Sequence, residues 1–307
     1  MRNTIVHLVH DLAKENPDVY FLTGDLGYSV IESFQKEFPD RCLNMGIAEQ
    51  NMMGAAAGLA LEGKKVFVYS IVPFVTMRCL EQIRTDIALQ NLDVTIIGVG
   101  GGFAYGTLGP THHAIEDVAM LRVIPRMKIL APADPVSAGI LGRQAFSHKG
   151  PLYVRLNRGG EPNLYDRESN LEFGKGFVIK PGKEISILCN GAITKNVLEA
   201  ADLLESSGLS VEVVDMATIK PLDVELIKER LSTRALVVTV EEHTIMGGFG
   251  SAVAEVVAES PRIALFKRLG VRDVYHTMFG NQEFMREQNG LSTGELFKTI
   301  RALYDTV

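Results

Sequence analysis

The sequence predicts an α/β protein of two domains, each a mostly parallel sheet flanked by helices. Its length of 307 residues favours two domains. Short apolar runs bounded by glycine alternate with amphipathic segments along both halves, the pattern of parallel strands joined by covering helices. Between the halves, residues 157–176 are polar and lack a period, as linkers do. We therefore expect domains at 1–160 and 177–307, with a linker at 161–176.

Each element of the first domain follows from its apolar spacing. Helices are expected where apolar residues recur every three or four positions, and strands where a short apolar run is continuous. The predicted helices are 3–16, 48–63, 79–90, 114–124 and 135–148. The predicted strands are 18–25, 64–71, 92–100, 127–133 and 151–156. This regular alternation predicts a sheet covered on both faces.

The second domain shows the same alternation on a smaller scale. Its predicted strands are 184–191, 209–217 and 235–243. Its predicted helices are 193–208, 224–232 and a helix that follows the stretch GGFG at 247–250. A second, smaller α/β domain is therefore expected.

Composition narrows the classes of partner and compartment. The net charge of −6 gives no reason to expect nucleic acid or an anionic membrane as a partner. The three cysteines are far apart and form neither a CxxC motif nor a His/Cys cluster, so we expect no zinc site and a reducing compartment. The N-terminus lacks the apolar core of a signal peptide, and no apolar run could span a membrane. We expect a soluble, cytoplasmic protein.

Three glycine-rich stretches suggest nucleotide binding but lack the spacing for it. GVGGGFAYG at 98–106 has Phe103 where a dinucleotide motif needs its last glycine. GGFGS at 247–251 opens a helix, but Ser251 and Ala252 follow its last glycine. GDLG at 24–27 lacks the lysine and serine of a phosphate loop. We interpret all three as tight turns at strand ends.

The stretch LGPTHHAIED at 108–117 is a candidate site. Thr111 is expected to cap a helix that starts with His112 and His113. A histidine at a helix start is disfavoured as a cation, so it would be neutral and able to transfer protons. The alternative is that the two histidines merely fill a loop. Metal binding is a weaker interpretation because adjacent histidines on a helix point in different directions.

Glu49 opens another candidate site, in GIAEQNMMGAAAGLA at 46–60. It is the only acid in an apolar stretch of small residues. The simpler interpretation is a first-turn glutamate that stabilises the helix dipole. The functional interpretation, a catalytic carboxyl, depends on the resemblance described next.

Six stretches occur in a recognisable order and spacing: GDLGYS (24–29), NMGIAEQNMMGAAAGLA (44–60), YSIVPFV (69–75), GPTHHAIEDVAMLR (109–122), ILAPAD (129–134) and YVRLNRG (153–159). Together they resemble the pyrimidine-binding domain of the transketolase family of thiamine diphosphate enzymes. The second half of the chain resembles the family's C-terminal domain. The pair GIAEQ and GPTHH at this separation is specific, whereas either motif alone is weak.

The resemblance implies roles for the cofactor-binding residues. Glu49 matches the glutamate that hydrogen-bonds to the aminopyrimidine ring of thiamine diphosphate and favours the tautomer that takes the thiazolium proton. Phe74 matches the aromatic residue that stacks on the pyrimidine, and Ile71 an apolar neighbour. Asp25 matches an acid near the cofactor, and the small residues of 54–58 suit a helix at a subunit interface.

The resemblance also implies substrate-binding residues. His112 matches a histidine that faces the reacting oxygens of the substrate and can transfer protons. Arg2, Ser29 and Arg155 stand where the family holds the phosphate of the donor sugar, and the arginine fork suits phosphate. Leu108 replaces the usual aspartate, and a histidine expected at 99–101 is missing, with Gly100 at its centre. We therefore expect an anionic sugar with fewer hydroxyls or a modification.

The chain lacks the Gly-Asp-Gly…Asn motif through which the family binds the diphosphate and Mg²⁺. We expect no metal ligands here, Mg²⁺ bound mainly by a partner subunit, and a homodimer of this chain within a heterotetramer. The predicted function is a two-component enzyme that transfers a two-carbon ketol unit between sugars. The main alternative is the β subunit of a 2-oxoacid or acetoin dehydrogenase E1 component. A deoxyxylulose phosphate synthase and a homologue without turnover fit less well.

Overall fold

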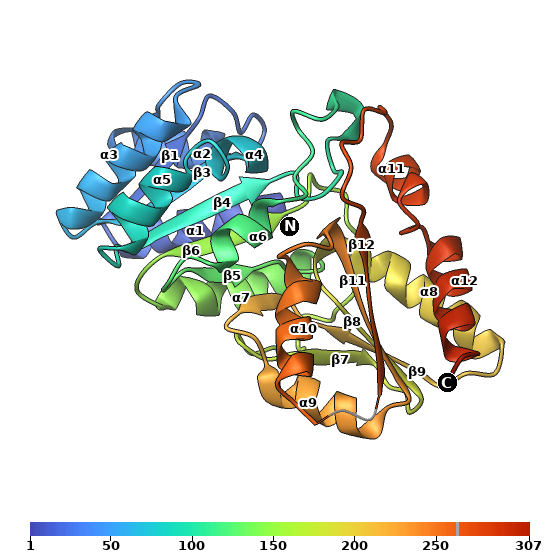
Figure 1. Ribbon diagram of the computed structural model, residues 1–307. Helices are drawn as coiled ribbons and strands as arrows, with labels where there is room; N and C mark the ends of the chain where they lie inside the picture. The colour runs from blue at the N-terminus through green and yellow to red at the C-terminus, as the bar shows by residue number, and fades with distance from the viewer. Residues whose placement is uncertain (262–263) are drawn as a thin grey trace. The chain divides into compact units, whose positions relative to one another are not determined.

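The computed structural model describes residues 1–261 and 264–307, which divide into two compact units (Figure 1). The first unit holds residues 1–101 and 120–173, and the second holds 102–119 and 174–307. Each contains a mostly parallel sheet flanked by helices, as the sequence predicts. The segment 102–119, which the sequence analysis places in the first domain, folds with the second unit.

The strands of the first unit lie in the order β5-β6-β4-β3-β1-β2, and their pairings are parallel. Strand β4 is buried along its whole length, because a parallel sheet is covered on both faces and selects a continuous apolar run. The strands are β1 (Val19–Thr23), β2 (Cys42–Asn44), β3 (Lys65–Ile71), β4 (Val94–Val99), β5 (Lys128–Leu130) and β6 (Leu152–Leu156).

Helices α1 and α7 pack against each other in this unit, and α3 packs against β3. Helix α7 begins at a capping box in which the Asp134 carboxylate accepts the Ser137 N–H at 2.7 Å. The helical elements are α1 (Arg2–Glu15), α2 (Glu32–Glu37), η1 (Pro39–Arg41), α3 (Glu49–Leu61), α4 (Val72–Val75), α5 (Leu80–Gln82), the π-helix η2 (Ile83–Ala88) and α7 (Pro135–Ser147). Helix α6 (Asp117–Arg122) spans the point at which the chain re-enters this unit.

The sheet of the second unit has the order β12-β11-β8-β9-β7, and only β7 runs antiparallel to its neighbour among the described pairings. Helices α8 and α12 lie on one side of it and α10 on the other (Figure 1). The strands of this sheet are β7 (Phe177–Lys180), β8 (Ile185–Cys189), β9 (Val211–Asp215), β11 (Leu236–Thr244) and β12 (Leu265–Val271), and the unit also holds β10 (Thr218–Lys220), which is not a strand of this sheet.

The helical elements of the second unit include a short segment inside the stretch 102–119. They are η3 (Gly106–Leu108), η4 (Gly191–Ile193), α8 (Thr194–Ser206), α9 (Val224–Thr233), α10 (Phe249–Ala258), α11 (Gln282–Gln288) and α12 (Thr293–Tyr304). Apolar residues of the loop 102–119, among them Phe103 and Ile115, join the core formed by β8, β9, β11 and α8. The loop is therefore an integral part of this unit.

Two predicted helices differ from the structure. The segment 79–90 forms α5 followed by the π-helix η2. The helix predicted to span 114–124 begins only at Asp117, so the residues before it belong to the loop. Strands β2, β7, β10 and β12 and helices α2, α4, α11 and α12 were not predicted. In the part of the chain that the structure describes, no helix has the length and apolar run that a membrane crossing requires.

Candidate functional site

The carboxyl ends of the parallel strands in the first unit carry most of the predicted site residues. Asp25 follows β1, Ile71 ends β3, and Arg155 lies one residue before the end of β6. Because these strands are parallel, their ends share one edge, where parallel sheets bind ligands. Glu49 begins the helix after β2 and so starts from the same edge. The fold therefore gathers residues that are far apart in the sequence.

Glu49 is the first residue of α3, and only 1% of it is exposed. Its Oε1 accepts a hydrogen bond from Ser70 Oγ at 3.3 Å, and its Oε2 accepts one from Arg78 Nη1 at 2.5 Å. Gly24 lets the chain after β1 pass close to Ser70, since a Cβ there would lie 3.2 Å from Ser70 Oγ, the donor to Glu49. A glutamate that served only the helix dipole could stay in water, so burial with dedicated donors favours the functional interpretation.

Phe74 lies in α4, directly after β3, and is half-buried. The Arg78 guanidinium lies 4.6 Å from the centroid of its ring while it also binds Glu49. A flat cationic group thus contacts both predicted cofactor residues at once. Ile71, also half-buried, is the residue immediately before α4.

Asp25 and Ser29 lie on the exposed loop after β1, and both have positive φ angles. The Asp25 carboxylate accepts a hydrogen bond from Asn44 Nδ2 at 2.9 Å, and the Asp25 N–H donates to Asn44 Oδ1. The Ser29 N–H donates to Glu32, which lowers the pKa of that carboxyl. The loop is thus held in a left-handed conformation by neighbouring polar side chains.

Arg155 and Arg2 belong to different elements at this edge. Arg155 is buried in β6, and Gly101 passes so close that a Cβ there would lie 3.0 Å from Arg155 Cζ. Arg2 begins α1, and its Nε is buried without a hydrogen-bond partner among the described residues. The N-terminal amine of Met1 binds Glu161, after β6, at 3.0 Å. This ion pair brings the start of α1 near the carboxyl end of β6.

His112 and His113 lie in the loop 102–119 of the second unit and not, as predicted, at a helix start. Their expected neutral state therefore has another cause than the helix dipole. Desolvation lowers the pKa of His112 and that of the more deeply buried His113. Thr111, expected as a helix cap, instead places its hydroxyl 3.0 Å from His112 Nδ1. His112 is half-buried and fits proton transfer in its neutral form.

We expect His113 to make the stability of the chain fall in mild acid. An unfolded histidine has a pKa of about 6.5, whereas desolvation lowers the pKa of folded His113. Between the two values the unfolded chain binds more protons, so the unfolding free energy falls as pH drops below about 6.5. Urea unfolding at pH 7.5 and pH 5 should show a smaller loss for His113→Gln than for the wild type. An equal loss would show that His113 does not contribute.

Sequence reasoning missed Arg78 and Ser70, the two donors to Glu49. Arg78 stands four residues after Phe74, the spacing that brings side chains together on a helical turn, and this was an available signal. Ser70 is a polar residue inside an apolar strand, which was a weaker signal, and the structure buries it fully. Neither signal names Glu49 as the partner.

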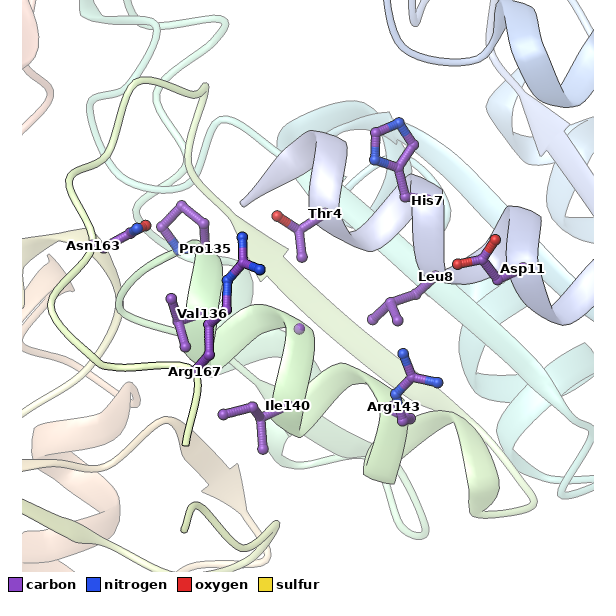
Figure 2. Close-up of a pocket in the computed structure, with 11 residues that line it drawn as sticks. Thr4, His7, Leu8, Asp11, Pro135, Val136, Ile140, Arg143, Asn163 and Arg167 are labelled. Carbon is purple, nitrogen blue, oxygen red and sulfur yellow. The ribbon is translucent and has the colours of Figure 1, made fainter. Parts of the chain in front are cut away.

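A cavity of about 440 Å³ lies between α1 and α7 of the first unit (Figure 2). Arg143 and Arg167 lie toward different ends of it, and His7 and Asp11 line it from α1. Its described lining includes none of the predicted site residues. Because these charged side chains are exposed, we interpret the cavity as a solvated surface groove of mixed charge.

Comparison with protein families matches residues 1–162 to "Transketolase, pyrimidine binding domain" and residues 174–291 to "Transketolase, C-terminal domain". The chain is 35% identical to a subunit of the apulose-4-phosphate transketolase of Phocaeicola vulgatus, over 97% of this chain and 95% of the relative. It is 32% identical to the 6-deoxy-6-sulfo-D-fructose transketolase subunit SqwH of a Clostridium species, over 99% and 94%. A solved split-gene transketolase, described as an inactive β4 tetramer, superposes with a TM-score of 0.87 at 39% identity, covering 98% of this chain and 96% of that one.

Proposed function

The chain belongs to the transketolase family, as the pyrimidine-binding and C-terminal subunit of a two-component, thiamine diphosphate-dependent enzyme, and from this premise we propose that it transfers a two-carbon ketol unit between anionic sugars. The comparisons favour this subunit over the E1 β subunit considered as the alternative. The observation that carries the site assignment is that Arg78 contacts both the buried Glu49 carboxylate and the Phe74 ring.

The residues at the sheet edge fit the pyrimidine end of the cofactor. The Arg78 guanidinium, a flat group with N–H donors, lies against the Phe74 ring and binds Glu49. A flat heteroaromatic ring can make the same two contacts. We propose that Glu49 hydrogen-bonds to the aminopyrimidine, that Phe74 and Ile71 pack against it, and that Asp25 lies nearby. When bound, thiamine diphosphate supplies the stabilisation of a carbanion, and this chain supplies orientation and a dry environment.

His112 is proposed to hold or move a proton at the oxygens of the substrate. Its lowered pKa keeps the imidazole neutral near pH 7, so that it can accept or share a proton. The exposed Leu108 cannot accept a hydrogen bond from a hydroxyl, which supports a sugar with an altered hydroxyl pattern.

The anionic group of the substrate is proposed to bind Arg2, Ser29 and Arg155. The names of two relatives describe substrates with a phosphate or a sulfonate, and both groups suit the arginine fork. The buried Arg2 Nε without a hydrogen-bond partner among the described residues is available to such an oxygen. A tetrahedral anion at this edge would thus be the common feature of the substrates.

We expect Arg155→Ala and Arg2→Ala each to weaken the binding of phosphorylated substrates by roughly 1.5–3 kcal/mol, because each substitution removes charged hydrogen bonds to the phosphate. The measurement is kcat/KM for phosphorylated and unphosphorylated sugars with the complete enzyme. The control is Arg143→Ala, an exposed arginine of the cavity between α1 and α7. Equal losses for both kinds of sugar would contradict the assignment of the anion site and, with it, the proposed substrate class.

The assembly is also part of the proposal. The family's diphosphate- and Mg²⁺-binding half is expected in a partner subunit, with two copies of each chain. Gly54 and Gly58 lie exposed on α3, and a Cβ at either position would meet nothing within 4 Å. With Ile47, 78% exposed, they leave room for close packing of a second copy. A cytoplasmic location remains an expectation, in keeping with three buried free thiols.

A further inference from the structure

The loop 102–119, which carries His112, is tied by its backbone to the second unit. Gly102 and Ala114 exchange two hydrogen bonds of 2.8 and 2.9 Å, which close the loop on itself. The Thr244 N–H at the end of β11 donates to the Ile115 carbonyl at 2.8 Å. The place of His112 therefore depends on β11, a strand of the domain for which the sequence predicts no role.

Glu242 of β11 holds the start of this loop. Its buried carboxylate accepts the Phe103 N–H at 2.6 Å and the Arg286 Nε–H at 2.7 Å. Gln282 donates to both of its oxygens. A Cβ at position 102 would lie 2.5 Å from Glu242 Oε1, so only glycine lets the chain come this close. This accounts for part of the glycine-rich stretch 98–106.

Arg286 is itself fixed by further partners. Its Nη1 donates to Asn196 Oδ1 at 2.8 Å and to Glu283 at 2.6 Å. A buried ion pair held by such additional hydrogen bonds has one preferred geometry, since any rearrangement leaves a charge uncompensated. Glu242 is therefore a rigid anchor for the Phe103 N–H.

His243 holds the other end of the loop. Its Nδ1 lies 2.7 Å from the Thr244 carbonyl and its Nε2 lies 3.3 Å from the Ala119 nitrogen. These partners assign a neutral tautomer in which Nδ1–H donates and Nε2 accepts the Ala119 N–H. Glu242 contacts Arg286, which binds α8, whereas His243 lies beside Gly248 at the start of α10. Because α8 and α10 cover opposite faces of the sheet, the two side chains reach the two ends of the loop from opposite faces (Figure 1).

The ring of Phe103, the residue that Glu242 holds, packs against His113 and His276. Its ring lies edge-to-face with His113 at 5.1 Å between centroids, and with His276 at 5.5 Å. A shift of the Phe103 backbone would therefore move His113 and, through the peptide bond, His112.

We propose that Glu242 and His243 are positioning residues that fix the loop 102–119 at its two ends and thereby place His112 for proton transfer. The inference depends on the role proposed above for His112. It gives the C-terminal domain a part in the reaction. Misplacement of a catalytic group by about 1 Å can cost on the order of 100-fold in rate.

The first test compares Glu242→Gln with Glu212→Gln. Glu212 is a similarly buried acid of the same unit, and it accepts from Ser186, Arg230 and Arg234. At both positions every partner described above is a donor, so the amide creates the same kind of mismatch. We expect kcat of the complete enzyme to fall about 10- to 100-fold for Glu242→Gln, with near wild-type kcat for Glu212→Gln at a similar loss of Tm. Equal losses of kcat would overturn the proposal.

Hydrogen exchange of the purified chain gives a readout independent of activity. The amides of Phe103 and Ala119 should exchange faster in Glu242→Gln and in His243→Gln, respectively, and neither should change in Glu212→Gln. If Glu242→Gln does not fold, Gln282→Ala removes one donor side chain from Glu242 and should produce a smaller increase in the exchange of the Phe103 amide. Unchanged exchange of these amides in a folded variant would overturn the anchoring.

A double substitution separates this inference from the proposed function. If Glu242 acts through His112, Glu242→Gln should lower kcat no further in a His112→Ala background. A further full loss there would show that Glu242 acts by another route. Wild-type kcat in His112→Ala alone would reject the role of His112 and hence the positioning proposal, while the exchange data would still report whether the loop is anchored.

Discussion

Glu49→Gln is expected to lower ketol transfer by the complete enzyme by about 10²–10⁴-fold, the range for loss of a needed proton-transfer group. The amide keeps the shape of the side chain but cannot exchange a proton with the cofactor ring. The fold should survive, because the Arg78 side chain is 41% exposed and can turn to water when its partner loses its charge. The direct measurement is the exchange rate of the cofactor C2 proton, followed by NMR with the partner subunit present.

The matched control is Asp93→Asn in the same unit. Asp93 pairs with Lys65 at 3.0 Å, at the opposite edge of the sheet, where the strands begin. Both substitutions remove an ion pair, but only Glu49→Gln should slow C2 exchange. Exchange at the wild-type rate in Glu49→Gln would reject the assignment of this carboxyl.

The second large effect is that the purified chain alone should show no ketol transfer and should bind thiamine diphosphate weakly. The proposed site residues would contact only the pyrimidine end of the cofactor and the substrate. A diphosphate needs Mg²⁺, which binds hard oxygen ligands together with phosphates, and we propose that the partner subunit supplies those ligands. A solved relative, 39% identical, is described as an inactive β4 tetramer of a split-gene transketolase.

Titration calorimetry with thiamine diphosphate and Mg²⁺ would test this directly, first on the chain alone and then after addition of the diphosphate-binding partner. The partner should restore both tight binding and ketol transfer. Gly54→Leu, on the exposed face of α3, should weaken the association of this chain with a second copy. The fold of the single chain should not change, because a Cβ at this position meets no atom of its own chain within 4 Å. Tight, Mg²⁺-dependent binding and turnover by the chain alone would contradict the two-component assignment.

The sequence by itself predicted the α/β architecture and the family. Continuous apolar runs such as 94–99 report burial on both faces, and they coincide with strands of the sheets. The motifs around Glu49 and Phe74 were recognisable because each is a short, contiguous stretch of sequence that resembles the family's. Local periodicity failed where a segment departs from regular helix, as in the π-helix at 83–88 and the loop before Asp117.

Only the tertiary structure decided which side chains meet. Arg78 and Glu49 are 29 residues apart, and Glu242 and Arg286 are 44 apart, yet each pair shares a hydrogen bond. From the sequence alone these charged residues would be assigned to the surface, because a buried ion pair between distant residues leaves no periodic pattern in the sequence. The loop 102–119 lies between two elements of the first unit, and nothing in its spacing shows that it folds with the second. That choice is made by the close approach of glycine backbone to the buried carboxylate of Glu242, which depends on how distant strands and helices pack.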